Sequence, residues 1–281
     1  MTRRRAILIV LTVVTALGLS SCRYVDPDFG YVKSADIVYG DGINENAELE
    51  QLKLDLYTPS GDTATNRPVV IWAHGGGFRM GDKMSGGAWA RELAMRGYVG
   101  ASINYRMDED AGEIRHPLDA YETQRIFWAV SDMKAAIRWF RANAASLGVD
   151  PNRIAVAGAS AGAVMALSTA VTHDDPGDTG DNPGFSSAVC TAISVSGATE
   201  PTLVDASDAG AIFFHGETDT VVPTNLAYAT RDAMIEAGLP TEFHLFEGEG
   251  HGISGPHRDE ILAAIYPWLR THLVHPPAPC I

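Results

Sequence analysis

The chain has 281 residues, 46% of them hydrophobic, so it can bury a large core, and a single α/β domain or barrel is the architecture that this length favours. Its formal net charge at pH 7 is −14. This charge argues against nucleic acid as a partner, because phosphate binding needs a basic surface, and it favours a neutral substrate.

The first residues have the layout of an export signal. Arginines at positions 3–5 precede an apolar stretch over residues 6–19 that is too short to span a bilayer comfortably. The stretch leads into Leu-Ser-Ser-Cys, ending at Cys22, which resembles a bacterial lipobox, where the chain is cut before a cysteine that becomes lipidated. We therefore expect residues 1–21 to be a signal peptide and the exported protein to be held at the cell membrane, outside the cytoplasm, by lipid on Cys22. An ordinary signal peptide with an incidental cysteine is the alternative.

After this signal we expect a tether over residues 22–34, one domain over residues 35–275 and a tail over residues 276–281. The two remaining cysteines are Cys190 and Cys280. In an exported protein an even pair of cysteines favours a disulfide, which here would tie the proline-rich tail to the domain. One buried thiol and one frayed chain end are the alternative.

The first elements of the domain are predicted to be strands. Leu52, Leu54 and Leu56 alternate with polar residues, which is the period-2 pattern of a half-buried strand. Residues 36–39 are a plausible antiparallel neighbour. Residues 69–73 form a continuous apolar run, typical of a strand covered on both faces.

From residue 69 onward, expected strands and helices alternate. The clearest helix covers residues 121–145, where one face is apolar and the charged residues point elsewhere. The apolar residues are Ile126, Val130, Met133, Ile137 and Phe140, and the charged ones are Asp132, Lys134, Arg138 and Arg141. The other expected helices cover residues 89–96, 161–171 and 226–237, and a last helix starts near residue 257 with a break or a second start at Pro267. The other expected strands cover residues 98–105, 154–157, 192–195, 211–214 and 242–246. The alternation predicts an α/β fold with an open, mainly parallel sheet flanked by helices and an antiparallel N-terminal strand pair.

One serine stands among small residues where an expected strand meets an expected helix. In Gly158-Ala159-Ser160-Ala161-Gly162, glycines two before and two after the serine relieve crowding in a sharp bend, which can expose Ser160 as a nucleophile. A small-residue turn that packs a helix against a sheet is the alternative, because short motifs also match by chance.

A glycine-rich loop follows the expected strand over residues 69–73. It reads His-Gly-Gly-Gly-Phe over residues 74–78, and consecutive glycines leave backbone N–H groups unshielded. We expect the N–H groups of Gly76, Gly77 and Ala161 to form an oxyanion hole beside the serine.

Two later loops supply the expected acid and base. Asp219 follows the strand over residues 211–214, where it can orient a histidine, with Glu217 in the same loop as the second choice. His251 lies in a glycine-flanked loop after the last strand and can act as general base and then general acid. His257 is the second choice for the base and is expected to cap a helix.

The order Ser160, Asp219, His251 is the chain order of α/β-hydrolase triads. With the glycine-rich loop, residues 69–273 resemble α/β-hydrolase serine esterases of the carboxylesterase and acetyl-esterase groups, related to the hormone-sensitive-lipase-like esterases. Two features depart from the last group. Small residues stand where it usually has an aspartate and a further glycine, namely at Ala159 and Ala163, and two strands replace its N-terminal helical cap, which favours a nearly cap-less esterase.

The resemblance implies a serine carboxylic-ester hydrolase that acts on short-chain acyl esters through an acyl-enzyme intermediate, without cofactor or metal. A small-molecule or carbohydrate ester would be the substrate. A serine peptidase of the same fold and a non-catalytic binding lipoprotein are the alternatives. The oligomeric state does not follow from the sequence.

Two charged segments have less specific patterns. Residues 106–125 are either a partial lid or a solvated loop. Residues 174–181 carry carboxylates in a glycine-rich loop, as calcium sites do, but they lack the EF-hand pattern and its final glutamate. A solvated acidic loop is therefore the favoured interpretation.

Overall fold

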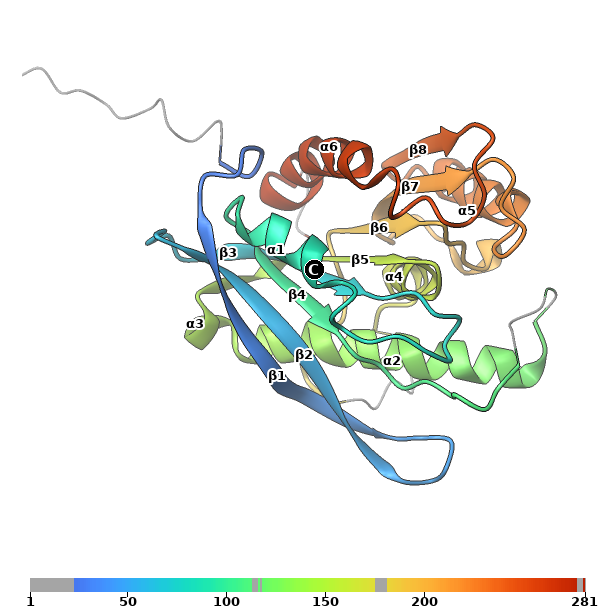
Figure 1. Cartoon of the computed structure of the whole chain (residues 1–281), viewed down its shortest axis with the longest axis horizontal. Helices are drawn as coiled ribbons and strands as arrows, with labels where there is room; N and C mark the ends of the chain where they lie inside the picture. The colour runs from blue at the N-terminus through green and yellow to red at the C-terminus, as the bar shows by residue number, and fades with distance from the viewer. Residues whose placement is uncertain (1–22, 113–115, 117, 175–180, 277–279, 281) are drawn as a thin grey trace, which may run out of the picture.

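The structure, a computed structural model, describes residues 23–112, 116, 118–174, 181–276 and 280. The expected signal peptide and Cys22 lie outside the described residues. Among the described residues, eight strands form one sheet in the order β1-β2-β4-β3-β5-β6-β7-β8 (Figure 1). The strands are β1 (Gly30–Ile43), β2 (Leu49–Ser60), β3 (Arg67–Ala73), β4 (Val99–Ile103), β5 (Val149–Ala159), β6 (Thr191–Val195), β7 (Gly210–Gly216) and β8 (Thr241–Phe246). The helices are α1 (Gly87–Ala94), α2 (Ala120–Ala142), α3 (Ala144–Leu147), α4 (Ala161–Val171), α5 (Thr224–Glu236) and α6 (Arg258–Leu269), with a 3-10 turn η1 (Pro201–Leu203) and a π-helical turn η2 (Arg270–Val274).

Strand direction follows the predicted pattern. β2 is antiparallel to both β1 and β4, and every other neighbouring pair is parallel. The expected antiparallel pair is present, with Ile37 opposite Leu54. The prediction of an open, mainly parallel sheet with an antiparallel N-terminal pair is confirmed.

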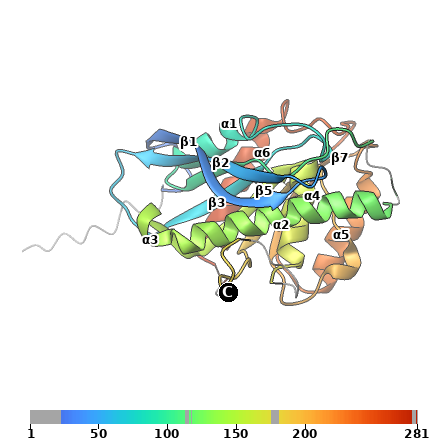
Figure 2. The same cartoon turned by 90° about the horizontal axis from the view of Figure 1, so that it is seen from below.

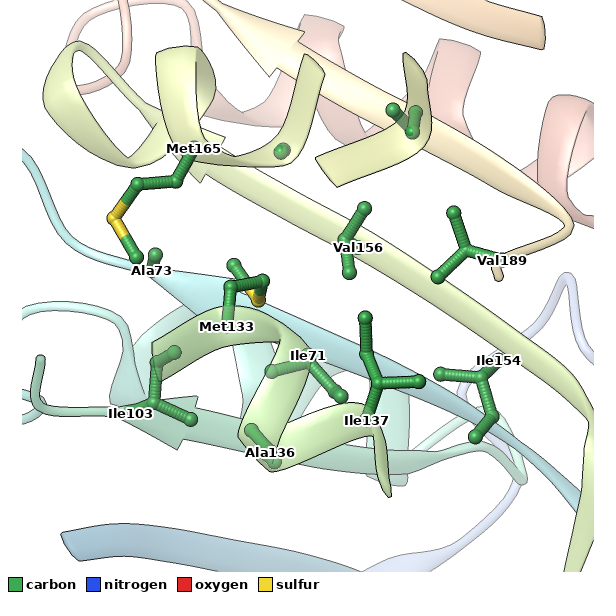
Figure 3. Close-up of a cluster of buried hydrophobic side chains, with 14 of the residues drawn as sticks. Ile71, Ala73, Ile103, Met133, Ala136, Ile137, Ile154, Val156, Met165 and Val189 are labelled. Atoms are coloured by element: carbon green, nitrogen blue, oxygen red, sulfur yellow. The ribbon is translucent and has the colours of Figure 1, made fainter. Parts of the chain in front are cut away.

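Helices cover both faces of the sheet, so its central strands are apolar on both sides. Figure 2 shows α1 and α6 above the sheet and α2, α4 and α5 below it. Along β3, Val69, Ile71 and Ala73 belong to the core between the sheet and helices α2 and α4, whereas Val70 and Trp72 pack with α1 and α6. Figure 3 shows the first of these cores, in which α2 contributes Met133, Ala136 and Ile137. In the described part of the chain, no helix combines the length and apolarity that crossing a membrane requires.

The charged residues of α2 are buried as well, which the sequence pattern does not predict. Asp132 forms an ion pair with Arg106, with 2.6 Å between Oδ1 and Nη2. Three of the helix's buried basic side chains donate to backbone carbonyls of neighbouring segments: Lys134 to Thr172, Arg138 to Asp181, and Arg141 to Pro151 and Ala188. Buried charges persist where such partners satisfy them. α2 is therefore enclosed between the sheet and these segments.

The N-terminal boundary of the domain differs from the prediction. Residues 30–34, assigned from the sequence to the tether, belong to β1, where Gly30 pairs with Ser60. Residues just before it are also attached, because the N–H groups of Tyr24 and Phe29 donate to carbonyls at the end of α1. The first part of β1 is exposed, so it carries no apolar alternation by which a strand could be recognised.

Pro267 does not break the last helix, although the sequence predicts a break or a second start there. α6 continues to Leu269 and passes into the π-helical turn η2. Buried residues on both sides of the proline anchor this helix on the sheet, and the indole N–H of Trp268 donates to Thr191 Oγ1 at 2.8 Å. Packing of the apolar face thus offsets the backbone hydrogen bond that proline cannot make.

Cys190 and Cys280 form a disulfide that closes a sequence separation of 90 residues. Cys190 precedes β6, so the bond ties the C-terminal tail to the amino end of a central strand. Residues 277–279 of this tail lie outside the described residues.

Replacing both cysteines by serine should lower the free energy of unfolding by about 2–4 kcal/mol, because the disulfide limits the freedom of the unfolded chain. Urea unfolding of the double variant and of the wild type with and without reductant measures the effect. Reduction should lower the stability of the wild type alone, and equal stability of all samples would contradict the prediction.

Candidate active site

Ser160 occupies a strained bend between β5 and α4. Its φ of 54° and ψ of −119° place a non-glycine residue in a region that side chains rarely adopt. A Cβ on Gly158 would lie 2.3 Å from the backbone of Gly162, and one on Gly162 would lie 2.2 Å from the carbonyl oxygen of Ala73. Both motif glycines are therefore required by backbone contact. The N–H of Ser160 donates to the carbonyl of Val195 at 2.8 Å, which fixes the bend against β6.

The structure brings Ser160, His251 and Asp219 together from the ends of three parallel strands. Nε2 of His251 lies 2.7 Å from Oγ of Ser160, and Nδ1 lies 2.7 Å from Oδ2 of Asp219. These distances are in hydrogen-bond range for a nucleophile, a base and an orienting acid. The arrangement can move a proton from the serine to the histidine while the carboxylate holds the ring.

Asp219 is held as a carboxylate by its surroundings. Burial raises its pKa, but hydrogen bonds from His215 and His251 and from the backbone N–H of Val221 outweigh burial and leave that pKa well below the usual range. Oδ1 accepts hydrogen bonds from the N–H groups of Val221 and Val222 at 2.9 and 3.0 Å. A negative Asp219 can stabilise a positively charged histidine.

Glu217 and His257, the second choices for the acid and the base, are not hydrogen-bonded to Ser160, His251 or Asp219 in the described structure. Each instead contacts a residue of the loop that carries His251. Oε2 of Glu217 accepts a hydrogen bond from the N–H of Gly248, at the start of the His251 loop. His257 occupies the N-cap position of α6, but its side chain makes no capping hydrogen bond and contacts Glu249 and Glu260 instead.

The glycine-rich loop after β3 lies directly beside the serine. A Cβ on Gly75 would lie 3.2 Å from Cβ of Ser160, and one on Gly76 would lie 1.8 Å from the carbonyl oxygen of Met80. Gly76 and Gly77 have φ values of 128° and 64°, which favour glycine. Within the described residues, the N–H groups of Gly76, Gly77 and Ala161 donate to no protein group. These N–H groups are the ones expected to bind an oxyanion.

A pocket of about 210 Å³ opens beside the nucleophile. Trp72 and Trp89 stack on each other at 4.3 Å between ring centroids and contribute to one wall. The complete lining is Trp72, His74, Gly75, Ser85, Trp89, Ala159, Ser160, Val195, Ser196, His251, Gly252 and Ser254. The pocket is small and combines aromatic surface with serine hydroxyls.

Two residues that touch the site were not identified from the sequence. Ser196, at a φ of 59°, donates from Oγ to the carbonyl oxygen of His251 at 3.0 Å. His215 is fully buried at the end of β7, and its Nε2 lies 3.2 Å from Oδ2 of Asp219. The only signal for His215 was its position four residues before the acid, in a strand that is otherwise apolar.

The two charged segments are only partly described. In the segment over residues 106–125, the N–H of Asp108 donates to the carbonyl of Phe78, which joins the segment to the glycine-rich loop; residues 113–115 and 117 lie outside the description. In the acidic loop, residues 175–180 lie outside it, and Asp181 accepts a hydrogen bond from the N–H of Asp41. No group of three or more potential metal ligands occurs among the described residues.

An open parallel sheet with a serine on a strained strand-to-helix bend, contacted by a histidine and an aspartate from later strand ends, defines a serine hydrolase of the α/β-hydrolase fold. Residues 54–200, just over half of the chain, match the BD-FAE family model. The chain belongs to the BD-FAE family, which confirms the resemblance to α/β-hydrolase esterases. Residues 194–275 also match the model of the prolyl oligopeptidase family.

Individual relatives and solved structures that are similar to this chain are also named as esterases. Over 147 residues the chain is 34% identical to esterase LipC of Mycobacterium tuberculosis, a match that covers 52% of this chain and 32% of LipC. Carboxylesterase NlhH of the same organism is 41% identical over 106 residues, which are 36% of this chain and 29% of NlhH. The matches thus span about a third or less of these relatives' own lengths. A butyrate-bound esterase of Thermogutta terrifontis superposes with a TM-score of 0.71 and 25% identity, covering 84% of this chain and 92% of that one.

Replacing Gly162 by alanine should destabilise the protein by about 1–3 kcal/mol, because the added Cβ would overlap the carbonyl of Ala73. Thermal and urea unfolding measure the loss. Gly255→Ala is the matched control, since a Cβ there meets nothing within 4 Å, and it should leave stability within about 0.5 kcal/mol. Equal stability of the two variants would contradict the role assigned to the motif glycine.

Proposed function

We propose that this protein hydrolyses carboxylic esters with short acyl chains through a covalent acyl-enzyme. The observation that carries the proposal is the continuous contact from Asp219 through His251 to Ser160, with 2.7 Å at each step. The esterase activity stated for LipC, NlhH and the Thermogutta protein supports it.

In the proposed reaction, Oγ of Ser160 attacks the ester carbonyl while Nε2 of His251 takes the serine proton. The N–H groups of Gly76, Gly77 and Ala161 stabilise the negative oxygen that forms. The carbonyl–oxygen bond to the alcohol then breaks, and His251 returns the proton to the departing alcohol. Water, deprotonated by the same histidine, hydrolyses the acyl-enzyme to the acid and restores the serine. These steps require no cofactor.

The size of the pocket supports a small substrate group. A space of about 210 Å³ beside Ser160 leaves little room for a long acyl chain. Related Thermogutta esterase structures are described as butyrate bound and propionate bound, which are short acids. The acidic surface favours a neutral ester, and a small-molecule or carbohydrate ester fits this requirement.

A serine peptidase is the second candidate function. The match of residues 194–275 to the prolyl oligopeptidase family favours it, because this segment carries both Asp219 and His251. The same three side chains can attack an amide, so the substrate decides between the candidates. A binding protein without catalysis is the third candidate, and the intact hydrogen-bonded chain of side chains argues against it.

We also propose that the protein is exported and anchored by lipid on Cys22. The proposal rests on the charged start, the apolar stretch and the Leu-Ser-Ser-Cys ending of the N-terminal segment. The N–H of Tyr24 donates to the carbonyl of Arg96, so an anchor at Cys22 would lie two residues before a residue that is attached to the domain.

The esterase proposal predicts rates on p-nitrophenyl esters from acetate to palmitate. Hydrolysis should be fastest with acyl chains of about four carbons or fewer, because the pocket is small, and Ser160→Ala should lower kcat at least a thousandfold or so. Ser168→Ala, on the helix that follows Ser160 but outside the pocket, should keep kcat within about twofold. Ser160-independent hydrolysis would overturn the proposal, and cleavage of peptides but not esters would favour the peptidase.

The anchor proposal predicts that labelled palmitate is incorporated into the full-length protein expressed in a bacterial host and that the protein sediments with membranes. Cys22→Ser should abolish both, because the acyl chains would have no attachment site. Cys190→Ser serves as the control, since that cysteine lies in the folded domain and should leave the label in place. Unchanged labelling of the Cys22 variant would overturn the proposal.

A further inference from the structure

His215 is a second histidine on the candidate catalytic acid. It lies near the carboxyl end of β7, whose residues are all buried, and its side chain has no exposed surface. Its Nε2 lies 2.9 Å from the carbonyl oxygen of Val222 and 3.2 Å from Oδ2 of Asp219. The same ring nitrogen of His215 therefore lies close to the carboxylate of Asp219 and to the carbonyl of Val222, three residues further along the same loop.

The neighbours of the ring identify its protonated nitrogen. Both groups near Nε2 are acceptors, so this nitrogen must be the donor. Nδ1 of His215 is buried and has no hydrogen-bond partner among the described residues. A proton on Nε2 thus satisfies the two acceptors, whereas a proton on Nδ1 would face no acceptor and leave Nε2 against two oxygens.

Both oxygens of the Asp219 carboxylate have hydrogen-bond donors nearby. Oδ1 accepts two backbone N–H groups, those of Val221 and Val222, and Oδ2 accepts from His251 and faces His215. The backbone donors lie in the same loop as Asp219, so they do not tie the carboxylate to another element. His215 differs, since it lies on β7, a buried strand paired on both sides, and connects the carboxylate to the sheet.

We propose that His215 is a positioning residue of the triad, whose Nε2–H anchors Oδ2 of Asp219 and the carbonyl of Val222 to the end of β7 so that the carboxylate stays aimed at His251. The proposal rests on the proposed serine-hydrolase function. His215 touches neither the serine nor the substrate pocket, so it acts through Asp219. Loss of the anchor would let the carboxylate turn away from the imidazole, and small displacements of this kind cost up to about a hundredfold in rate.

Thr224 provides a matched control, because it restrains the same loop without contacting the carboxylate. Its Oγ1 donates to the carbonyls of Gly216 and Glu217 at 2.8 and 3.2 Å. If His215 only stiffened the loop, loss of either side chain would have a similar effect on activity.

The test compares His215→Met, His215→Gln and Thr224→Val in the full protein. Methionine removes the donor, whereas the amide of glutamine can place a donor near the position of Nε2. Two kinetic measurements are made: kcat and KM on p-nitrophenyl acetate, and the rate at which a fluorophosphonate labels Ser160. The low-field proton resonance between His251 and Asp219 provides a spectroscopic measurement, and thermal melting checks folding.

We expect His215→Met to lower kcat and the labelling rate by about ten- to a hundredfold with KM within about twofold, and to move or broaden the low-field resonance. His215→Gln should recover most of the rate, and Thr224→Val should stay within about twofold of the wild type. Wild-type rates for His215→Met, or an equal loss in Thr224→Val, would overturn the proposal.

If His215→Met does not fold, His215→Asn replaces it, because its shorter amide does not reach Oδ2. Equal rates for the asparagine and glutamine variants would then overturn the proposal. A wild type that is labelled but hydrolyses no ester overturns only the esterase function, since labelling still measures the effect of His215.

Discussion

The backbone bend at Ser160 is the constraint on which the rest of the structure depends. A non-glycine residue at φ 54° costs of the order of 1–3 kcal/mol, and it persists only where its surroundings leave no alternative. Here β5 lies buried between β3 and β6, and α4 packs closely over the strand ends, with Gly158 and Gly162 in backbone contact. The buried apolar residues of β5 and α4 supply the free energy that holds the strained residue.

Parallel strand direction explains why the other site groups come to this bend. The glycine-rich loop follows β3, and the loops of Asp219 and His251 follow β7 and β8. All of these strands run in the same direction as β5, so their carboxyl ends lie at one edge of the sheet. Residues more than 90 positions apart in the chain are thereby brought within hydrogen-bond distance.

Polar contacts between loops then fix the orientation that the sheet alone does not determine. Glu217 and Thr218 connect the acid loop to the His251 loop, and Ser196 holds the carbonyl of His251 from the end of β6. Because backbone and side-chain groups in these loops are mutually satisfied, the imidazole has a defined position between the serine and the carboxylate.

The sequence by itself determined the elements whose signals are local. The apolar runs of β3 and β5, the helix over residues 161–171 and the two glycines around Ser160 were all predictable, because they depend on periodicity and on backbone crowding between neighbours in the chain. The order of Ser160, Asp219 and His251 was also predictable, because each residue follows an expected strand in the sequence. Only the tertiary structure decided that Glu217 and His257 hold loops, that the charges of α2 are buried, that β1 begins at Gly30 and that α6 passes through Pro267. His257 contacts Glu249 and Glu260, which lie within eight residues of it. Each of the other features depends on a partner distant in the sequence, and a contact of that kind leaves no pattern in the residues around it.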